Sequence, residues 1–141
     1  MEHVLCSRVM TFLDSTNLLH HNQHGFRKQR SCETQLALFV QEIHSAVDTG
    51  AQVDAVFLDF RKAFDTVPHF RLVKKLRAYG ISDQICDWIQ DFLEERTQHV
   101  VLSGSKAADV EVVSGVPQES VIGTLLFTLY INDLVDNIGS L

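Results

Sequence analysis

The sequence has little of what marks a secreted, membrane-spanning or disulfide-stapled protein. Its three cysteines are far apart and include no Cys-x-x-Cys pair, which argues against a disulfide framework and a thiolate zinc site. The longest apolar run, residues 121–131, is interrupted by Gly123 and two threonines and falls short of the roughly 20 residues that cross a bilayer. No charged and then apolar leader follows Met1, so we expect an intracellular protein of the cytoplasm or nucleus, neither secreted nor bound to a membrane.

Positive charge is also scarce. The chain has 12 Lys and Arg against 18 Asp and Glu, a net charge of −6, whereas proteins that hold nucleic acid by charge alone carry a basic excess. The distribution is uneven, because Arg27, Lys28 and Arg30 form one basic cluster and residues 71–77 hold a second. A chain of 141 residues that is 45% hydrophobic is long enough for one core, so we expect a single folded unit over residues 1–141.

Hydrophobic periodicity predicts a mixture of helices and strands. Apolar residues at helical spacing predict helices over residues 4–13, 31–50, 70–79, 83–95 and 121–134. Alternating and β-branched residues predict a hairpin over residues 97–113, with its turn at Ser103-Gly104-Ser105. A further apolar run at 53–58 predicts a buried strand above the last helix. The fold class is therefore α+β, with helices packed on a small antiparallel sheet.

An aspartate lies at the end of the predicted strand. Asp59 directly follows Val56-Phe57-Leu58, where the pattern turns charged before Pro68. An aspartate at the end of a strand is a good position for a metal ligand, and equally for a residue that caps the next element. The residues by themselves leave both interpretations open.

Three segments in order resemble the reverse transcriptases of non-LTR retrotransposons of the LINE, jockey and CR1 type. Residues 57–65, FLDFRKAFD, resemble the first catalytic segment of that family. Residues 24–31, HGFRKQRS, match a segment that precedes it, and residues 114–127, SGVPQESVIGTLLF, match one that follows. The resemblance implies a partial fingers–palm fragment, with residues 1–50 on the fingers side and 51–141 in the palm. It also implies that the chain ends before the Ala-Asp-Asp segment and the thumb of the family.

The resemblance implies RNA-directed DNA synthesis from an RNA template, a DNA primer and deoxynucleoside triphosphates. Asp59 and the backbone carbonyl of Phe60 would bind Mg²⁺, of which the complete family site holds two ions. Two such ions about 4 Å apart repel by roughly 17 kcal/mol at an effective dielectric of 20, so one carboxylate is not enough to hold both. We therefore expect the chain by itself to be inactive.

The remaining site residues are also implied by the resemblance. Phe64 would lie under the sugar of the incoming nucleotide and exclude a 2′-hydroxyl, although a Phe of this kind is equally a core residue. The other nucleotide-binding residues would be Gln118 and Arg30, and template contacts would come from Arg27 and Lys28. For Arg27, Lys28 and Arg30, the alternative is a basic loop that is simply solvated.

Departures from the family pattern keep other functions open. Glu119 and Gln29 stand where relatives carry Gly, which places side chains where backbone must approach a ligand. One alternative is a catalytically inactive remnant that retains nucleic-acid or protein binding. An aspartyl-phosphate phosphatase is the weaker alternative, because its Asp-x-Asp pattern requires an acid at the position of Arg61.

Overall fold

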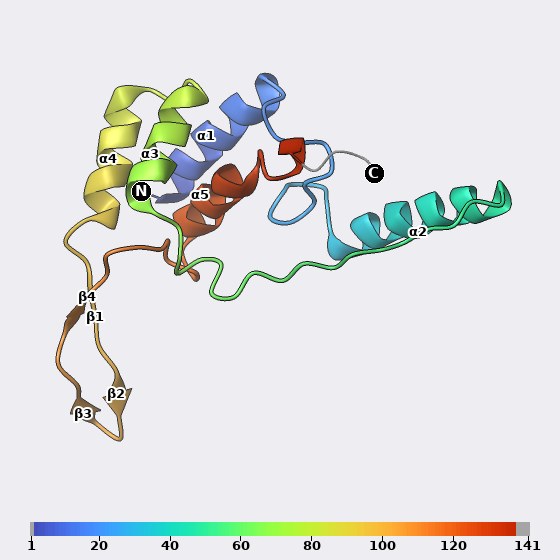
Figure 1. Cartoon of the computed structure of the whole chain (residues 1–141). Helices are drawn as coiled ribbons and strands as arrows, with labels where there is room; N and C mark the ends of the chain where they lie inside the picture. Colours follow the sequence, from blue (N-terminus) through green and yellow to red (C-terminus); the bar gives the residue numbers. More distant parts are fainter. Residues whose placement is uncertain (1, 138–141) are drawn as a thin grey trace.

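The computed structural model describes residues 2–137, which form a helical body, a projecting arm and a projecting hairpin (Figure 1). The described part contains five α-helices and two small antiparallel sheets, which confirms the α+β class. The helices are α1 (Glu2–Ser15), α2 (Cys32–Asp48), α3 (His69–Ala78), α4 (Asp83–Leu93) and α5 (Val121–Ile131), and the 3₁₀ turn η1 (Val135–Asn137) follows. All five helices lie where the periodicity predicted them. Among residues 2–137, no helix is both long enough and apolar enough to cross a membrane.

Four of the helices form the core. α5 packs against α1 and α3, and α3 also packs against α4. Leucine side chains from each of these helices are fully buried at their shared centre: Leu13, Leu72, Leu76, Leu93, Leu126 and Leu129. α5 therefore lies within a helical bundle and not under a strand, which corrects the predicted position of this helix.

A buried asparagine ties the end of α5 to the loop after α1. Asn132 is 8% exposed, and its side-chain oxygen accepts a hydrogen bond from the amide of His20 at 2.8 Å. Its side-chain nitrogen donates to the carbonyl of Leu18, also at 2.8 Å. The asparagine thus satisfies backbone groups that the core side of this loop would otherwise leave unpaired.

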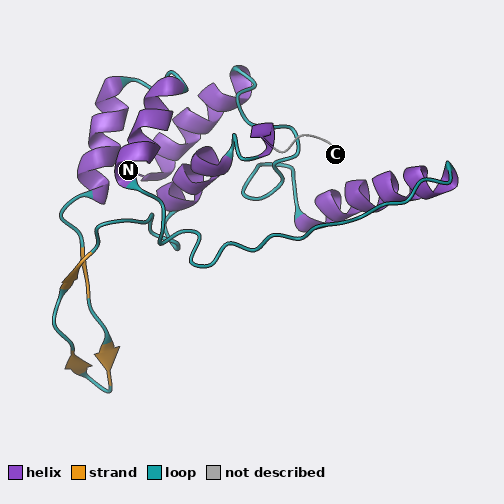
Figure 2. Ribbon diagram, viewed as in Figure 1, coloured by secondary structure: helices purple, strands orange, loops and turns teal. Residues whose placement is uncertain are grey.

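The hairpin lies where the sequence predicted it, but none of the helices within residues 2–137 packs on either of its faces (Figure 2). Its strands are β1 (Thr97–Gln98), β2 (Val101–Leu102), β3 (Ser105–Lys106) and β4 (Val110–Glu111), with β1 paired to β4 and β2 to β3. Its two-residue turn has positive φ at both Ser103 and Gly104 (50° and 82°), as a type I′ turn requires. Every strand residue is exposed, so the predicted packing of helices on a sheet is wrong for the described residues.

The arm consists of α2 and the segment that returns from it. None of the residues of α2 is buried, although Ser31 caps it with a reciprocal hydrogen-bond pair to Thr34. The extended segment 51–60 runs back along the helix (Figure 1). The rings of Phe39 and Phe57 meet edge to face, with 5.9 Å between their centroids. The apolar stripe predicted for this helix is present but uncovered, because Leu36 and Val40 remain 60% and 46% exposed.

The strand predicted over residues 53–58 does not form in the described structure. Residues 51–60 have irregular backbone, and Val56, Phe57 and Leu58 are 81%, 82% and 69% exposed. Strand propensity becomes a strand only when a neighbouring edge supplies hydrogen bonds. The described residues offer segment 52–61 no such partner, since its backbone makes no hydrogen bond to any other described segment.

Candidate functional site

Two segments that are fifty residues apart in sequence meet at the base of the hairpin. The amide of Val116 donates to the carbonyl of Phe64 at 2.9 Å, and the amide of Gly115 donates to the carbonyl of Val67 at 2.8 Å. The hydroxyl of Ser114 donates to the carbonyl of Asp65 at 2.9 Å. We call this contact between residues 64–67 and 114–116 the junction. It holds the turn that carries Gln118 beside the turn that follows Asp59.

The junction depends on a glycine. Gly115 has φ +94°, a left-handed conformation that side chains rarely adopt, and its backbone lies against that of Asp65. A Cβ placed on Gly115 would come within 2.7 Å of the Asp65 Cα and 2.8 Å of its carbonyl oxygen. The two segments therefore approach as closely as they do because position 115 has no side chain.

Phe64 lies at the centre of an aromatic array that joins all three sequence segments. Its ring stacks on Phe127 of α5 at 4.1 Å between centroids, with 19° between the planes. Phe26, from the upstream loop, meets it edge to face at 6.1 Å. Phe64 is half-buried and packs against the hydrophobic core. It thus packs against the core, as the alternative interpretation expects, without being fully buried.

Asp59 and Phe60 lie in the extended segment before the junction. Both are exposed, and Phe60 also lines an apolar hollow of about 290 Å³ with Ala63, Phe127 and Tyr130. Among residues 2–137, no three His, Cys, Asp or Glu side chains are grouped so that they could hold a metal ion. The junction brings the turn that follows Asp59, at residues 64–67, against residues 114–116, while Asp59 itself stays in the exposed segment before that turn.

Gln118 belongs to a polar hollow at the base of the hairpin. This hollow, of about 400 Å³, is lined by Gln118, Lys62, Asp65, Arg96 and Glu111, among others. Lys62 and Arg96 were not predicted from the sequence, since only the fold brings these cations next to Gln118. Glu119 is exposed and does not line the hollow, so its carboxylate lies outside the space beside Gln118.

The basic cluster before α2 is largely used to shape its own loop. The guanidinium of Arg27 donates to the carbonyl of His20 at 3.2 Å and pairs with Asp14 at 3.5 Å, and its side chain is only 15% exposed. Arg30 donates to the carbonyls of His21 and Gln23.

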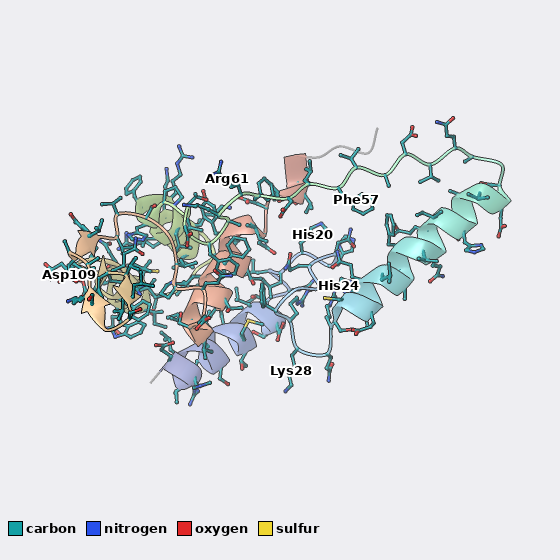
Figure 3. All side chains as sticks on the ribbon, turned by 90° about the horizontal axis from the view of Figure 1, so that it is seen from below. His20, His24, Lys28, Phe57, Arg61 and Asp109 are labelled. Carbon is teal, nitrogen blue, oxygen red and sulfur yellow. The ribbon has the colours of Figure 1, made fainter. Side chains whose placement is uncertain are left out.

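Lys28, by contrast, lies at the tip of the loop and points outward (Figure 3). Gln29 next to it has φ +62°, a conformation that favours glycine. Within residues 2–137, the Lys28 side chain makes neither an ion pair nor a hydrogen bond, so its ammonium can contact an outside partner.

His24 is a residue whose role the sequence did not reveal. It is 7% exposed, and its Nδ1 lies 2.9 Å from the hydroxyl of Thr34, inside the first turn of α2. The capping pattern of Ser31 and Thr34 is readable in the sequence, but the histidine that anchors it is not. His24 thus fixes the upstream loop to the start of the arm.

Comparison with known proteins decides which family these features represent. The sequence matches the reverse transcriptase (RNA-dependent DNA polymerase) family over residues 1–140. The chain belongs to the reverse transcriptase family. It is 34% identical over 134 residues, or 95% of its length, to the RNA-directed DNA polymerase of the mobile element jockey from Drosophila melanogaster. It is 30% identical over 94% of its length to the probable RNA-directed DNA polymerase of the Drosophila melanogaster transposon X-element.

A more distant relative is the Pol polyprotein of the type-1 retrotransposable element R2 from Popillia japonica, with 32% identity over 64% of this chain. These comparisons confirm the resemblance to non-LTR elements. The chain spans 14% of the length of the jockey and X-element polymerases. The predicted role of Asp59 as a metal ligand stays a prediction, and residues 2–137 group no three His, Cys, Asp or Glu side chains that could hold a metal ion.

Proposed function

We propose that this chain is the part of an RNA-directed DNA polymerase of a mobile element that supplies one side of the nucleotide-binding site. The observation that carries the proposal is the junction, which joins the turn that follows Asp59, at Phe64 and Val67, to the segment that leads into the Gln118 turn, at Gly115 and Val116. A polymerase gains most of its rate by holding the primer end and the nucleotide in fixed positions, so a rigid link between the two segments is what that chemistry needs.

Each residue has a defined role in this proposal. The Asp59 carboxylate and the Phe60 carbonyl would contribute oxygen ligands for Mg²⁺, the cation that suits such donors. Phe64 would present the free part of its ring to the sugar, and Gln118 would lie against the incoming nucleotide. The further metal ligands would come from another part of a longer protein. Synthesis would take place inside the cell, in the cytoplasm or nucleus.

The basic loop has a divided role. Lys28 is exposed and free of ion pairs within residues 2–137, so it would contact the template backbone directly. Arg27 and Arg30 would act by holding the loop in shape, because their guanidinium groups already bind loop carbonyls. In this arrangement residues 1–50 belong to the fingers and 51–141 to the palm.

A second candidate is a catalytically inactive remnant that binds nucleic acid or protein. The absence of a three-ligand group among residues 2–137 favours it, because few carboxylates poorly offset the repulsion between two divalent ions. The large exposed apolar side chains of segment 53–60 also fit a chain that binds a partner. Metal-dependent turnover separates the two candidates.

The test is primer extension on an RNA template by a chimera. In this chimera the chain replaces the matching segment of the Drosophila melanogaster jockey polymerase, to which it is 34% identical. The proposal predicts Mg²⁺-dependent extension that is abolished in Asp59→Asn and retained in the matched variant Asp54→Asn. Asp54 is also exposed and lies in the same segment, so it controls for the loss of one negative charge. An inactive chimera, or activity that survives Asp59→Asn, would favour the remnant.

A further inference from the structure

The outer face of α3 combines free cations with an exposed aromatic ring. The inner face of this helix buries Leu72, Val73 and Leu76. On the outer face Phe70 is 80% exposed, and both Arg71 and Lys74 are exposed. The helix contains no acidic residue. The sequence pattern assigned Phe70 to the apolar stripe of the helix, so its exposure is a finding that needs an explanation.

Within the described residues, two cations of this face have no acidic partner, unlike their neighbours at the end of the helix. Arg77, at the end of the same helix, pairs with Asp83 at 3.2 Å and Asp87 at 2.7 Å. Lys75 pairs with Asp133. Neither Arg71 nor Lys74 forms an ion pair with any residue of the described range 2–137. In a chain of net charge −6, two neighbouring cations without acidic partners leave a local positive surface.

The same residues line a hollow. Arg71, Lys74, Lys75 and Ala78 surround it together with Tyr130 of α5, and its volume is about 450 Å³. The ammonium of Lys75 lies over the Tyr130 ring at 4.9 Å, which holds both side chains in place. Lys75 and Tyr130 also line the apolar hollow beside Phe60. The basic face of α3 is therefore continuous with the surface next to the Asp59 segment.

We propose that the outer face of α3 binds single-stranded nucleic acid, with Arg71 and Lys74 at the phosphates and Phe70 stacked on a base. Proteins that bind single strands combine cations along the backbone with aromatic rings for the bases. Phe70 and Lys74 are one helical turn apart on the same face, so both reach one strand. A duplex keeps its bases stacked inside, so the ring of Phe70 would have no base to stack on. An acidic protein surface would likewise offer no base to this ring.

This surface does not include Asp59, Phe64 or Gln118, and binding there requires no turnover. The inference therefore stands whether or not the chain takes part in DNA synthesis.

The first test measures the salt dependence of binding. The purified chain is titrated against a short fluorescein-labelled oligouridylate, and fluorescence anisotropy is followed at several salt concentrations. Removing both charges in Arg71→Gln/Lys74→Gln should lower the slope of log K against log salt by about 1.4, or about 0.7 for each phosphate that the protein no longer neutralises. The control is Arg8→Gln, which removes an exposed charge from α1 and should leave the slope unchanged.

The second test addresses the aromatic ring. Phe70→Ala should weaken oligouridylate binding by roughly tenfold, whereas Phe70→Trp should preserve it, because stacking needs only a flat ring. Circular dichroism checks that each variant is folded, as expected for changes at exposed positions. The proposal is overturned if the parent chain does not bind, if the Arg71/Lys74 variant keeps the parental slope, or if Phe70→Ala binds as the parent does. Tighter binding of a duplex of the same length would also contradict it.

Discussion

Replacing Gly115 by alanine should break the junction. The added methyl group would lie 2.7 Å from the Asp65 Cα and 2.9 Å from its carbonyl carbon, where no side-chain rotation relieves the overlap. The backbone must therefore move, and the hydrogen bonds that the amides of Gly115 and Val116 donate to the Val67 and Phe64 carbonyls must lengthen or break. The Gln118 turn would then separate from the turn that follows Asp59.

The expected cost follows from two effects. An alanine at φ +94° is strained, at about 1–2 kcal/mol, and overpacking against rigid backbone adds about 1–3 kcal/mol. The lower entropy of the unfolded alanine chain offsets about 0.4–1 kcal/mol. The net loss is about 3 kcal/mol of the free energy of unfolding. In urea, with a slope of about 1.5 kcal/mol per molar, the unfolding midpoint should fall by about 2 M.

The assay is urea unfolding followed by circular dichroism, with Gly80→Ala as the matched control. Gly80 also has positive φ (+81°), but its nearest neighbour for a Cβ is Phe12 Cζ at 3.7 Å, an ordinary contact. The control therefore carries the strain without the overlap and should lower the midpoint by less than about 1 M. Equal midpoints for Gly115→Ala and Gly80→Ala would refute the close approach at the junction.

Three further predictions concern the helical body and its loops. Burial raises the pKa of the Cys6 and Cys86 thiols. At mildly alkaline pH a thiol reagent should therefore label the exposed Cys32 first, and Cys6 and Cys86 only after unfolding. Labelling of all three cysteines at the same rate would contradict this prediction. Asn132→Ala should lower the free energy of unfolding by about 2 kcal/mol, measured by thermal melting. The change leaves the amide of His20 and the carbonyl of Leu18 without their hydrogen-bond partner. Gln29→Gly should instead raise the free energy of unfolding by about 0.5 kcal/mol, because glycine relieves the strain of the left-handed conformation. A lower melting temperature of this variant would argue against that conformation of Gln29.

Local patterns predicted the helices because their signals lie within a few residues. Ser31 caps α2 as expected, and Gly80 follows α3 with a positive φ of 81°. The Ser103-Gly104 turn of the hairpin is equally local. The family was also correctly predicted from its three segments, whereas the site residues that those segments imply stay a prediction.

Contacts between distant segments were not predictable in the same way. The apolar run before Asp59 has the propensity of a strand, but within residues 2–137 no edge pairs with it, and it remains extended and exposed. Arg27 and Arg30 looked like ligand-binding cations, whereas the carbonyls that they bind belong to a loop whose path no local rule specifies. The need for glycine at position 115 likewise depends on Asp65, fifty residues away.

The most direct test of the proposed site is sugar discrimination at Phe64. In the jockey chimera, single-nucleotide extension would compare kcat/KM for a deoxyribonucleotide and the matching ribonucleotide. Phe64→Val should raise ribonucleotide use relative to deoxyribonucleotide use, because a smaller side chain leaves room for the 2′-hydroxyl. Phe64→Tyr keeps the ring and its stacking on Phe127, so it should retain the parental ratio. A ratio unchanged by Phe64→Val would mean that Phe64 serves only the core and that the nucleotide lies elsewhere.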